Sequence, residues 1–202
     1  MVMAQRHKAE QSQQPRRARL GTRDWADAAL AAIREGGGLA AVAVEPLAAR
    51  LGTTKGSFYW HFAGREALIE AALARWVEAN TDEIITAVET EPDPEKRLRG
   101  LFLRVTEPDA ADPLELSLLA STDHPQVAAA LQQVTERRIA YLAELFTELG
   151  FAEDEARRRG LMAYSFYLGH SQLGHAVPSA LPSREDFPTY LGATLDALLR
   201  RG

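Results

Sequence analysis

The chain contains no cysteine among its 202 residues. Disulfide bonds, thiolate metal sites and cysteine nucleophiles are therefore excluded for this sequence. Long apolar runs are missing too, since no stretch approaches the roughly 20 residues that a membrane-spanning helix needs. The pair Arg16 and Arg17 is not followed by the apolar segment of an export signal, because residues 21–24 are polar or glycine. Together with an ordinary globular composition, these absences predict a cytoplasmic protein that does not enter the membrane.

The sequence also lacks a recognisable catalytic or metal-binding pattern. The run Glu153, Asp154 and Glu155 stands at the start of a predicted helix, where carboxylates complement the helix dipole. His170 and His175 are five positions apart, which places them about 140° apart around a helix rather than on one metal-binding face. We therefore predict no enzyme activity, no metal site and no cofactor.

Charge is divided unevenly along the chain. The formal net charge of −5 argues against a general nucleic-acid binder. Residues 1–66, however, hold ten Lys and Arg against six Asp and Glu, a net +4, whereas residues 67–202 hold thirteen against twenty-two, a net −9. A basic segment on an acidic body favours binding to a polyanion at one limited site.

Helix signals follow one another from Thr22 onward, and no long stretch alternates with the period of a strand. Residues 1–21 are polar and without periodicity, so we expect a disordered basic arm there. Helices are predicted over 22–36, 45–51, 55–62, 65–90, 94–106, 113–121, 125–149, 153–177 and 185–200, with starts and stops set by capping residues, prolines and glycines. The predicted fold class is all-α, with about nine helices.

Two short helices joined through residues 52–54 have the form of a helix-turn-helix, whose second helix enters the major groove of DNA. In the helix over 55–62, Phe58 and Phe62 share one face and should pack onto the preceding helices. The faces of Lys55 with Tyr59, and of Gly56 with Trp60, remain for DNA.

Each residue type suits a role at such an interface. Lys55 at the helix start can reach a guanine edge or a phosphate, and Tyr59 and His61 can donate to phosphate oxygens. Thr54 caps the helix, while Gly56 and Ser57 allow a close approach of the backbone. For Trp60, the groove edge and packing within the protein stay open as alternatives.

The segments over 48–62 and 65–68 resemble the amino-terminal domain of TetR-family regulators, a resemblance that covers residues 22–69. It implies that Thr22, Thr54, Lys55, Tyr59, His61 and Arg65 contact DNA, with Arg65 binding a phosphate at the start of the next helix. One departure is Ala43, which stands where the second helix of the family usually begins with a capping Ser or Thr. Arg16, Arg17 and Arg19 could enter the minor groove or remain in a solvated tail.

The resemblance further implies a homodimer that reads a palindromic double-stranded DNA operator in the nucleoid and is released by a small-molecule effector, as a repressor. Activation, and an architectural DNA-binding role without an effector, are the alternatives. The predicted domains are a basic arm (1–21), a helix-turn-helix DNA-binding domain (22–66) and an effector-binding and dimerisation domain (67–202). The last two helices should form the dimer interface, where close approach would explain Gly160, Gly169 and Gly174.

Candidate effector-binding residues lie along one side of the helix over 153–177 and on other helices. They are aromatic or hydroxyl-bearing residues and one histidine, which could line a pocket for a flat, partly polar molecule. Dimer interface or ordinary core is the alternative for each. The candidates are Trp76, Phe102, Tyr141, Tyr164, Tyr167, Ser171 and His175.

Overall fold

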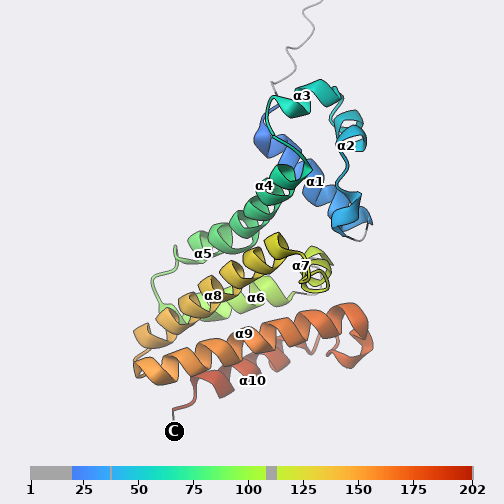
Figure 1. Cartoon of the computed structure of the whole chain (residues 1–202). Helices are drawn as coiled ribbons and strands as arrows, with labels where there is room; N and C mark the ends of the chain where they lie inside the picture. The colour runs from blue at the N-terminus through green and yellow to red at the C-terminus, as the bar shows by residue number, and fades with distance from the viewer. Residues whose placement is uncertain (1–19, 37, 108–112, 202) are drawn as a thin grey trace, which may run out of the picture.

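The computed structural model describes residues 20–36, 38–107 and 113–201, and these are helical without a single strand (Figure 1). The predicted all-α class is confirmed. The elements are α1 (Thr22–Gly36), η1 (Leu39–Ala41), α2 (Val44–Arg50), α3 (Lys55–Tyr59), α4 (Arg65–Val77), η2 (Glu78–Asp82), α5 (Glu83–Val88), α6 (Pro94–Thr106), α7 (Pro113–Leu119), α8 (Pro125–Glu148), α9 (Glu153–Ala176), η3 (Pro178–Ala180) and α10 (Phe187–Leu199).

The helix predicted over 65–90 is continuous but not uniform. Its middle, η2, is a π-helical turn between α4 and α5. When α4, η2 and α5 are counted as one helix, the described residues contain the nine predicted helices, plus the short 3₁₀ turns η1 and η3 that the sequence pattern did not predict. The third helix is shorter than expected, because residues 60–62 continue only as turns that bond back to Ser57 and Phe58.

Two hydrophobic cores hold the helices together. The first contains residues of α1 to α4, such as Trp25, Phe58 and Trp76, but also Leu114 and Leu118 of α7 and the first half of α8. The second joins α5, α6, the second half of α8, α9 and α10. The predicted domain boundary at residue 66 lies in the first turn of α4. The first hydrophobic core extends across this boundary, because it contains residues from both sides of it. The division into a DNA-binding domain and an effector-binding and dimerisation domain therefore stays a prediction.

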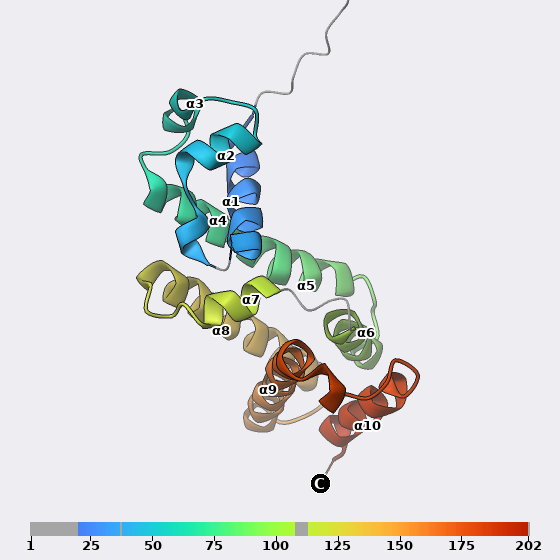
Figure 2. The same cartoon turned by 90° about the vertical axis from the view of Figure 1, so that its right-hand side faces the viewer.

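The helices are arranged with α2 and α3 at one end of the molecule and α9 and α10 at the other (Figures 1 and 2). Helices α8 and α9 form a hairpin through Gly150, whose φ of 87° lies in the left-handed region that favours glycine. A Cβ at Gly160 would lie 3.0 Å from the backbone of both Ile139 and Ala143. The close approach that explains Gly160 is therefore between α9 and α8 of one chain.

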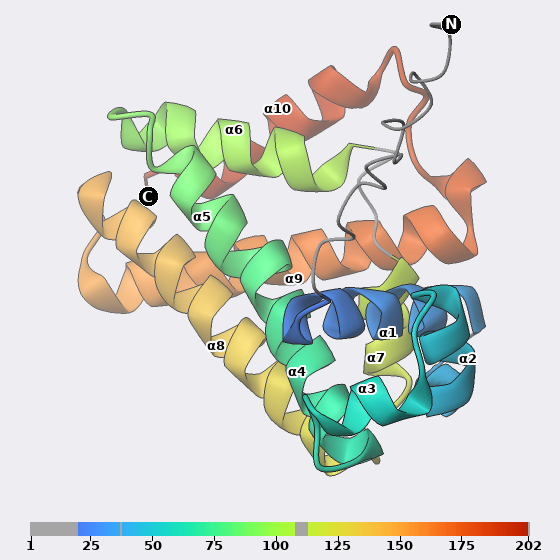
Figure 3. The ribbon, with the colours of Figure 1, turned by 90° about the horizontal axis from the view of Figure 1, so that it is seen from above.

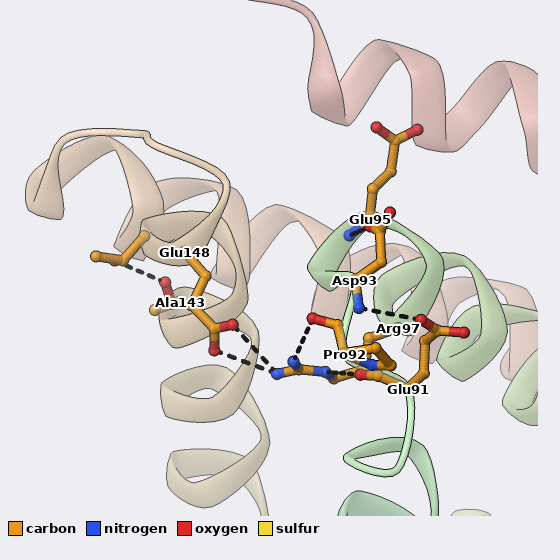
Figure 4. A network of polar contacts seen from close by, with 8 residues as sticks. Glu91, Pro92, Asp93, Glu95, Arg97, Ala143 and Glu148 are labelled. Atoms are coloured by element: carbon orange, nitrogen blue, oxygen red, sulfur yellow. Dashed lines mark hydrogen bonds and ion pairs between the residues drawn. The ribbon is translucent and has the colours of Figure 1, made fainter.

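Arg97 fastens the loop between α5 and α6 to the end of α8 (Figure 4). Its guanidinium donates to the carbonyl oxygens of Glu91 and Pro92 and to both carboxylate oxygens of Glu148, at 3.0 to 3.4 Å. Asp93 begins α6 by accepting from the backbone N–H groups of the next turn, as the Asp-Pro pattern predicts. These contacts fix one wall of the second core.

Polar and apolar contacts connect the amino-terminal helices to the rest of the chain. Arg75 of α4 pairs with Asp27 of α1 at 3.4 Å and with Glu83 of α5 at 2.8 Å. Helix α7 packs against α1, which covers it in the view from above (Figure 3). Within the described part of the chain, no helix is both long and apolar enough to span a membrane.

Candidate functional site

The turn before α3 has the geometry that its sequence predicts. Gly52 has a φ of 63°, in the left-handed region that ends α2 sharply. Thr54 then caps α3, since its Oγ1 accepts a hydrogen bond of 3.3 Å from the backbone N–H of Ser57. The cap leaves the start of α3, with its partial positive charge, at the surface of the molecule.

The aromatic residues of α3 divide into buried and exposed groups. Phe58 is fully buried, with its ring 5.4 Å from those of both Trp25 and Phe62. Tyr59 and Trp60 are 56% and 89% exposed. Trp60 is therefore not a packing residue of this chain, and its contact with DNA stays a prediction.

The other predicted residues of α3 also lie at or near the surface. The Nζ of Lys55 is paired with the carboxylate of Glu45 on α2 at 2.6 Å, and this hydrogen bond raises the pKa of Lys55. Both side chains are exposed, so the pair contributes little stability and can open when a phosphate competes. A Cβ at Gly56 would meet only Thr54 Oγ1, at an ordinary 3.6 Å. Packing within the chain thus does not require glycine there. Ser57 and His61 are half-buried.

Thr22 and Arg65 have surroundings that the sequence did not predict. Thr22 is exposed as the first residue of α1, and the capping position is Gly21, whose N–H donates to Asp24 Oδ2 at 2.7 Å. Arg65 donates to the carbonyl oxygens of Leu39 and Val42, at 2.6 and 2.9 Å. Arg65 thereby holds the segment before α2 against α4, and its phosphate contact stays a prediction. Arg16, Arg17 and Arg19 lie outside the described residues.

Ala43 occupies the N-cap position of α2 in extended conformation, and no side chain caps this helix. The structure thus agrees with the sequence-based expectation that α2 lacks a side-chain cap at its first turn. We expect Ala43→Ser to raise the free energy of unfolding by less than about 1 kcal/mol, because a serine hydroxyl could accept only from the backbone N–H of Glu45: the third residue of the helix, Pro46, has no N–H. Urea unfolding measures this. Ala49→Ser, the same exchange inside α2 at an exposed position, should instead be neutral or slightly destabilising. Equal effects of both exchanges would contradict the capping explanation.

A cavity of about 100 Å³ lies among η2, α5, α6, α7, α8 and α9. Four of the seven candidate effector residues line it: Phe102, Tyr141, Tyr164 and Tyr167. Ser171 and His175 instead line a second cavity of about 250 Å³, formed by the ends of α6 and α9 and the starts of α7 and α10. Trp76 is fully buried in the first hydrophobic core and lines neither cavity. The seven residues are therefore not brought together at one site.

The polar wall of the smaller cavity is a buried network that the sequence analysis missed. Arg138 of α8 donates to Glu115 Oε1 of α7 at 2.7 Å, to Thr81 Oγ1 of η2 at 3.1 Å and to the carbonyl oxygen of Asn80 at 3.0 Å. Tyr167 of α9 donates to Glu115 Oε2 at 2.8 Å. Helices α7, α8 and α9 and the turn η2 thus meet at the ion pair of Arg138 and Glu115. The side chains of this pair are only 13% and 9% exposed.

Burial and charge fix the protonation of this network. Burial alone would lower the pKa of the Arg138 guanidinium, but the adjacent Glu115 carboxylate outweighs it, and the pKa is raised. Burial, together with the same carboxylate, raises the pKa of the Tyr167 phenol well above its ordinary value. Arg138 therefore carries its positive charge and Tyr167 keeps its proton, which it donates to Glu115.

A signal for Arg138 was present in the sequence. The apolar stripe of α8 runs through Val127, Leu131, Val134, Tyr141 and Leu145, and Arg138 occupies the position of that stripe between Val134 and Tyr141. A charged residue at a core position is rarely tolerated without a partner. The same π-helical turn that supplies Thr81 is a local irregularity of a kind common at functional sites.

Histidine does not gather with carboxylates at either cavity. His170 is buried, and its Nε2 lies 3.1 Å from the carbonyl oxygen of Thr106. Over residues 20–36, 38–107 and 113–201, no group of three His, Asp or Glu side chains could hold a metal ion.

The comparisons with known proteins agree with the arrangement of α1 to α4. Residues 26–72 match the model of the tetR family of bacterial regulatory proteins. A search of the curated proteins finds no match. Among solved structures, a protein from Mesorhizobium loti MAFF303099 assigned to the TetR family of transcriptional regulators is 20% identical, with a TM-score of 0.66 over 88% of this chain and 94% of that one. A transcriptional regulator from Rhodococcus sp. Rha1 is 19% identical, with a TM-score of 0.68 over 89% and 94%.

At these identities the solved structures show a shared fold, and the family model identifies the DNA-binding helices. The amino-terminal domain over residues 26–72 therefore belongs to the tetR family of bacterial regulatory proteins, and the protein is a DNA-binding regulator of transcription.

Proposed function

We propose that this regulator is a homodimeric repressor, which binds a palindromic operator in the nucleoid through α3 and leaves it when a small effector enters the cavity beside Arg138. The observation that carries the proposal is the exposed face of α3. Tyr59 and Trp60 are large side chains that the described residues leave 56% and 89% exposed, on a helix held from behind by the buried Phe58. Such a helix fits the major groove and presents aromatic and hydroxyl groups to base edges and phosphates.

The carboxyl-terminal helices support the dimer. On α9, three large apolar side chains are exposed, Leu161, Met162 and Leu173, and Val177 directly after the helix is exposed as well. A Cβ at Gly169, or at Gly192 of α10, would meet no atom of the described residues within 4 Å. Glycine inside a helix costs about 1 kcal/mol relative to alanine, and packing among the described residues does not explain either glycine. A second copy packed closely on α9 and α10 would explain both, and the dimer would carry two α3 helices, one for each half-site of a palindrome.

Placing a charge on this face is expected to separate the subunits. Met162 is 59% exposed and lies two turns before Gly169 on the same face of α9. We expect Met162→Glu to raise the dimer dissociation constant by at least about thirtyfold, because a carboxylate would be buried without a partner. Analytical ultracentrifugation measures this. Leu119→Glu on α7 changes another exposed leucine, 40% exposed, and should leave the dimer intact. Dissociation by Leu119→Glu alone would place the interface elsewhere.

The position of α7 supports release by an effector. Glu115 lies in the wall of the cavity, while Leu114 and Leu118 of the same short helix are buried in the first hydrophobic core with Trp25 of α1. A displacement of Glu115 would therefore change the packing beneath the DNA-binding helices. An effector can shift the protein away from DNA only if it binds the two conformations with different affinities.

The test begins with duplexes selected by the full-length protein from a random-sequence pool, followed by footprinting. We expect one palindrome with half-sites about 34–36 Å apart, and lower transcription in vitro when the protein occupies it. Uniform protection of all duplexes would instead indicate an architectural protein. Protection of the palindrome with increased transcription would indicate an activator, and either result would overturn the proposed repressor.

A further inference from the structure

We propose that the cavity beside Arg138 binds a small carboxylic acid with an apolar body about the size of a benzene ring, and that its carboxylate takes the place of Glu115 on Arg138. This inference rests on the proposed function, because it names the chemistry and the action of the proposed effector. Three features of the cavity support it: its size, the unused donors of Arg138, and the connection of Glu115 to α7.

The size of the cavity limits the ligand. Its volume of about 100 Å³ is below the 300–1,000 Å³ typical of sites for drug-sized molecules. It is close to the roughly 150 Å³ of an engineered apolar cavity that binds benzene. The walls away from Arg138 are aliphatic or aromatic, formed by Ile84, Ile85, Leu101, Phe102, Val105 and Leu142. One ring or a short branched chain fits these walls.

Arg138 determines the polar group. A guanidinium has five N–H groups and no acceptor, and the hydrogen bonds to Glu115, Thr81 and Asn80 use three of them. The buried side chain of Arg138 therefore has donor capacity left on the wall of the cavity. The ligand group that matches a guanidinium best is a carboxylate, which can accept two parallel hydrogen bonds.

A ligand carboxylate would compete with Glu115 rather than join it. Arg138 and Glu115 balance each other's charge at a site where both side chains are largely buried. A second carboxylate beside them would leave one negative charge without a partner, which is costly at low dielectric. Glu115 therefore gives up its hydrogen bond with Arg138, and its side chain leaves room for the incoming group.

The loss of this ion pair removes the charged contact between α7 and α8, and leaves the apolar packing of Leu114 and Leu118 to hold α7. The second cavity, lined by Pro113 and Leu116 of α7, gives that helix space to shift. Because α7 packs against α1, the shift moves the support of the DNA-binding helices. Glu115, the side chain that the ligand displaces, thus connects the cavity to the helices that bind DNA.

Three probes with the same ring and different charges test the ligand class: benzoate, benzamide and benzylammonium. Calorimetric titration of the full-length dimer without DNA is expected to show benzoate binding at least about tenfold tighter than benzamide, and no binding of benzylammonium, since hydrogen bonds between ions are the strongest class. Equal binding of all three, preference for benzylammonium, or no binding of benzoate at millimolar concentration would overturn the proposal.

Two variants test the competition. Glu115→Gln keeps an acceptor for Tyr167 but removes the competing charge, so benzoate should bind this variant more tightly than the parent protein. The double variant Arg138→Met with Glu115→Gln should lose the preference for benzoate over benzamide while its circular dichroism stays that of the parent. Unchanged benzoate affinity in both variants would place the acid elsewhere and overturn the proposal.

A last measurement distinguishes failure of this inference from failure of the proposed function. Benzoate at saturation should weaken operator binding of the parent protein and not of the double variant. If benzoate binds through Arg138 but leaves operator affinity unchanged, the ligand class stands and release by an effector is wrong. If the operator is footprinted as a palindrome and its occupation lowers transcription, but benzoate does not bind, the repressor stands and the ligand class is wrong.

Discussion

Phe58→Ala is expected to lower the free energy of unfolding by about 3–5 kcal/mol and to abolish specific binding of DNA. The ring of Phe58 is fully buried between Trp25 of α1 and Phe62. Its removal leaves a cavity under a helix of only five residues, which has little stability of its own. Urea unfolding followed by circular dichroism measures the loss of stability, and fluorescence anisotropy with the selected operator measures binding.

The neighbouring exchange Tyr59→Ala provides the matched control, because it removes an aromatic ring from the other face of the same helix. Tyr59 is more than half exposed, and its ring has an edge contact with Phe58 at 5.1 Å, so stability should fall by about 1 kcal/mol, well below the loss expected for Phe58→Ala. Operator affinity should nevertheless fall, and the slope of log affinity against log salt should become shallower by about 1 if the hydroxyl binds a phosphate. If Tyr59→Ala unfolds the domain, or Phe58→Ala leaves it stable and bound to DNA, the division of α3 into a packed and a DNA-facing side is wrong.

This division could be predicted from the sequence because it depends on local geometry alone. Residues four apart on a helix share a face, so Phe58 and Phe62 had to lie together, away from Lys55 and Tyr59. The caps of α3 and α6 and the stop at Gly150 were predictable for the same reason, since each depends on residues within one turn. Such signals fix most helix bounds to within one or two residues.

The cavity could not be predicted in this way, because it depends on how distant helices pack. Tyr164, Ser171 and His175 were grouped by their common side of α9, but α9 is long enough for its two halves to face different cavities. Trp76 was grouped by its aromatic ring, but the neighbours of α4 bury that ring completely. Glu115 and Arg138 are 23 positions apart, and only the packing of α7 on α8 brings them into contact.

Arg65 shows a further limit of local reasoning. Its place at the start of α4 follows from the sequence, and the family resemblance implies a phosphate there. In the structure, two acceptors of Arg65 belong to a segment 23 to 26 residues earlier, which lies outside the predicted helices, and a third is the carboxylate of the neighbouring Glu66. A guanidinium has five N–H donors, so Arg65 can bind acceptors within the protein and also a phosphate of DNA. The family resemblance implies the phosphate, whereas only the three-dimensional structure shows the acceptors within the protein.

Arg138→Met should cause the second large effect, a loss of about 3–5 kcal/mol of stability, because it leaves the Glu115 carboxylate buried without its cation. Methionine has nearly the length of the arginine stem and suits the apolar stripe of α8, so a cavity is not the cause of the loss. Differential scanning calorimetry at neutral pH measures the effect.

The double variant with Glu115→Gln separates charge from packing. If the cost of Arg138→Met is the unpaired carboxylate, removing that charge should restore most of the lost stability, leaving the double variant within about 1–2 kcal/mol of the parent protein. Such a recovery would mean that the ion pair is not needed for the fold, which any apolar or neutral pair of similar volume could support. A buried ion pair that the fold can replace, on the wall of a cavity and on the helix beneath α1, is retained for what it binds and releases. A double variant as unstable as the single one would instead show that Arg138 acts by holding Thr81 and the π-helical turn, and the switching role of Glu115 would lose its physical basis.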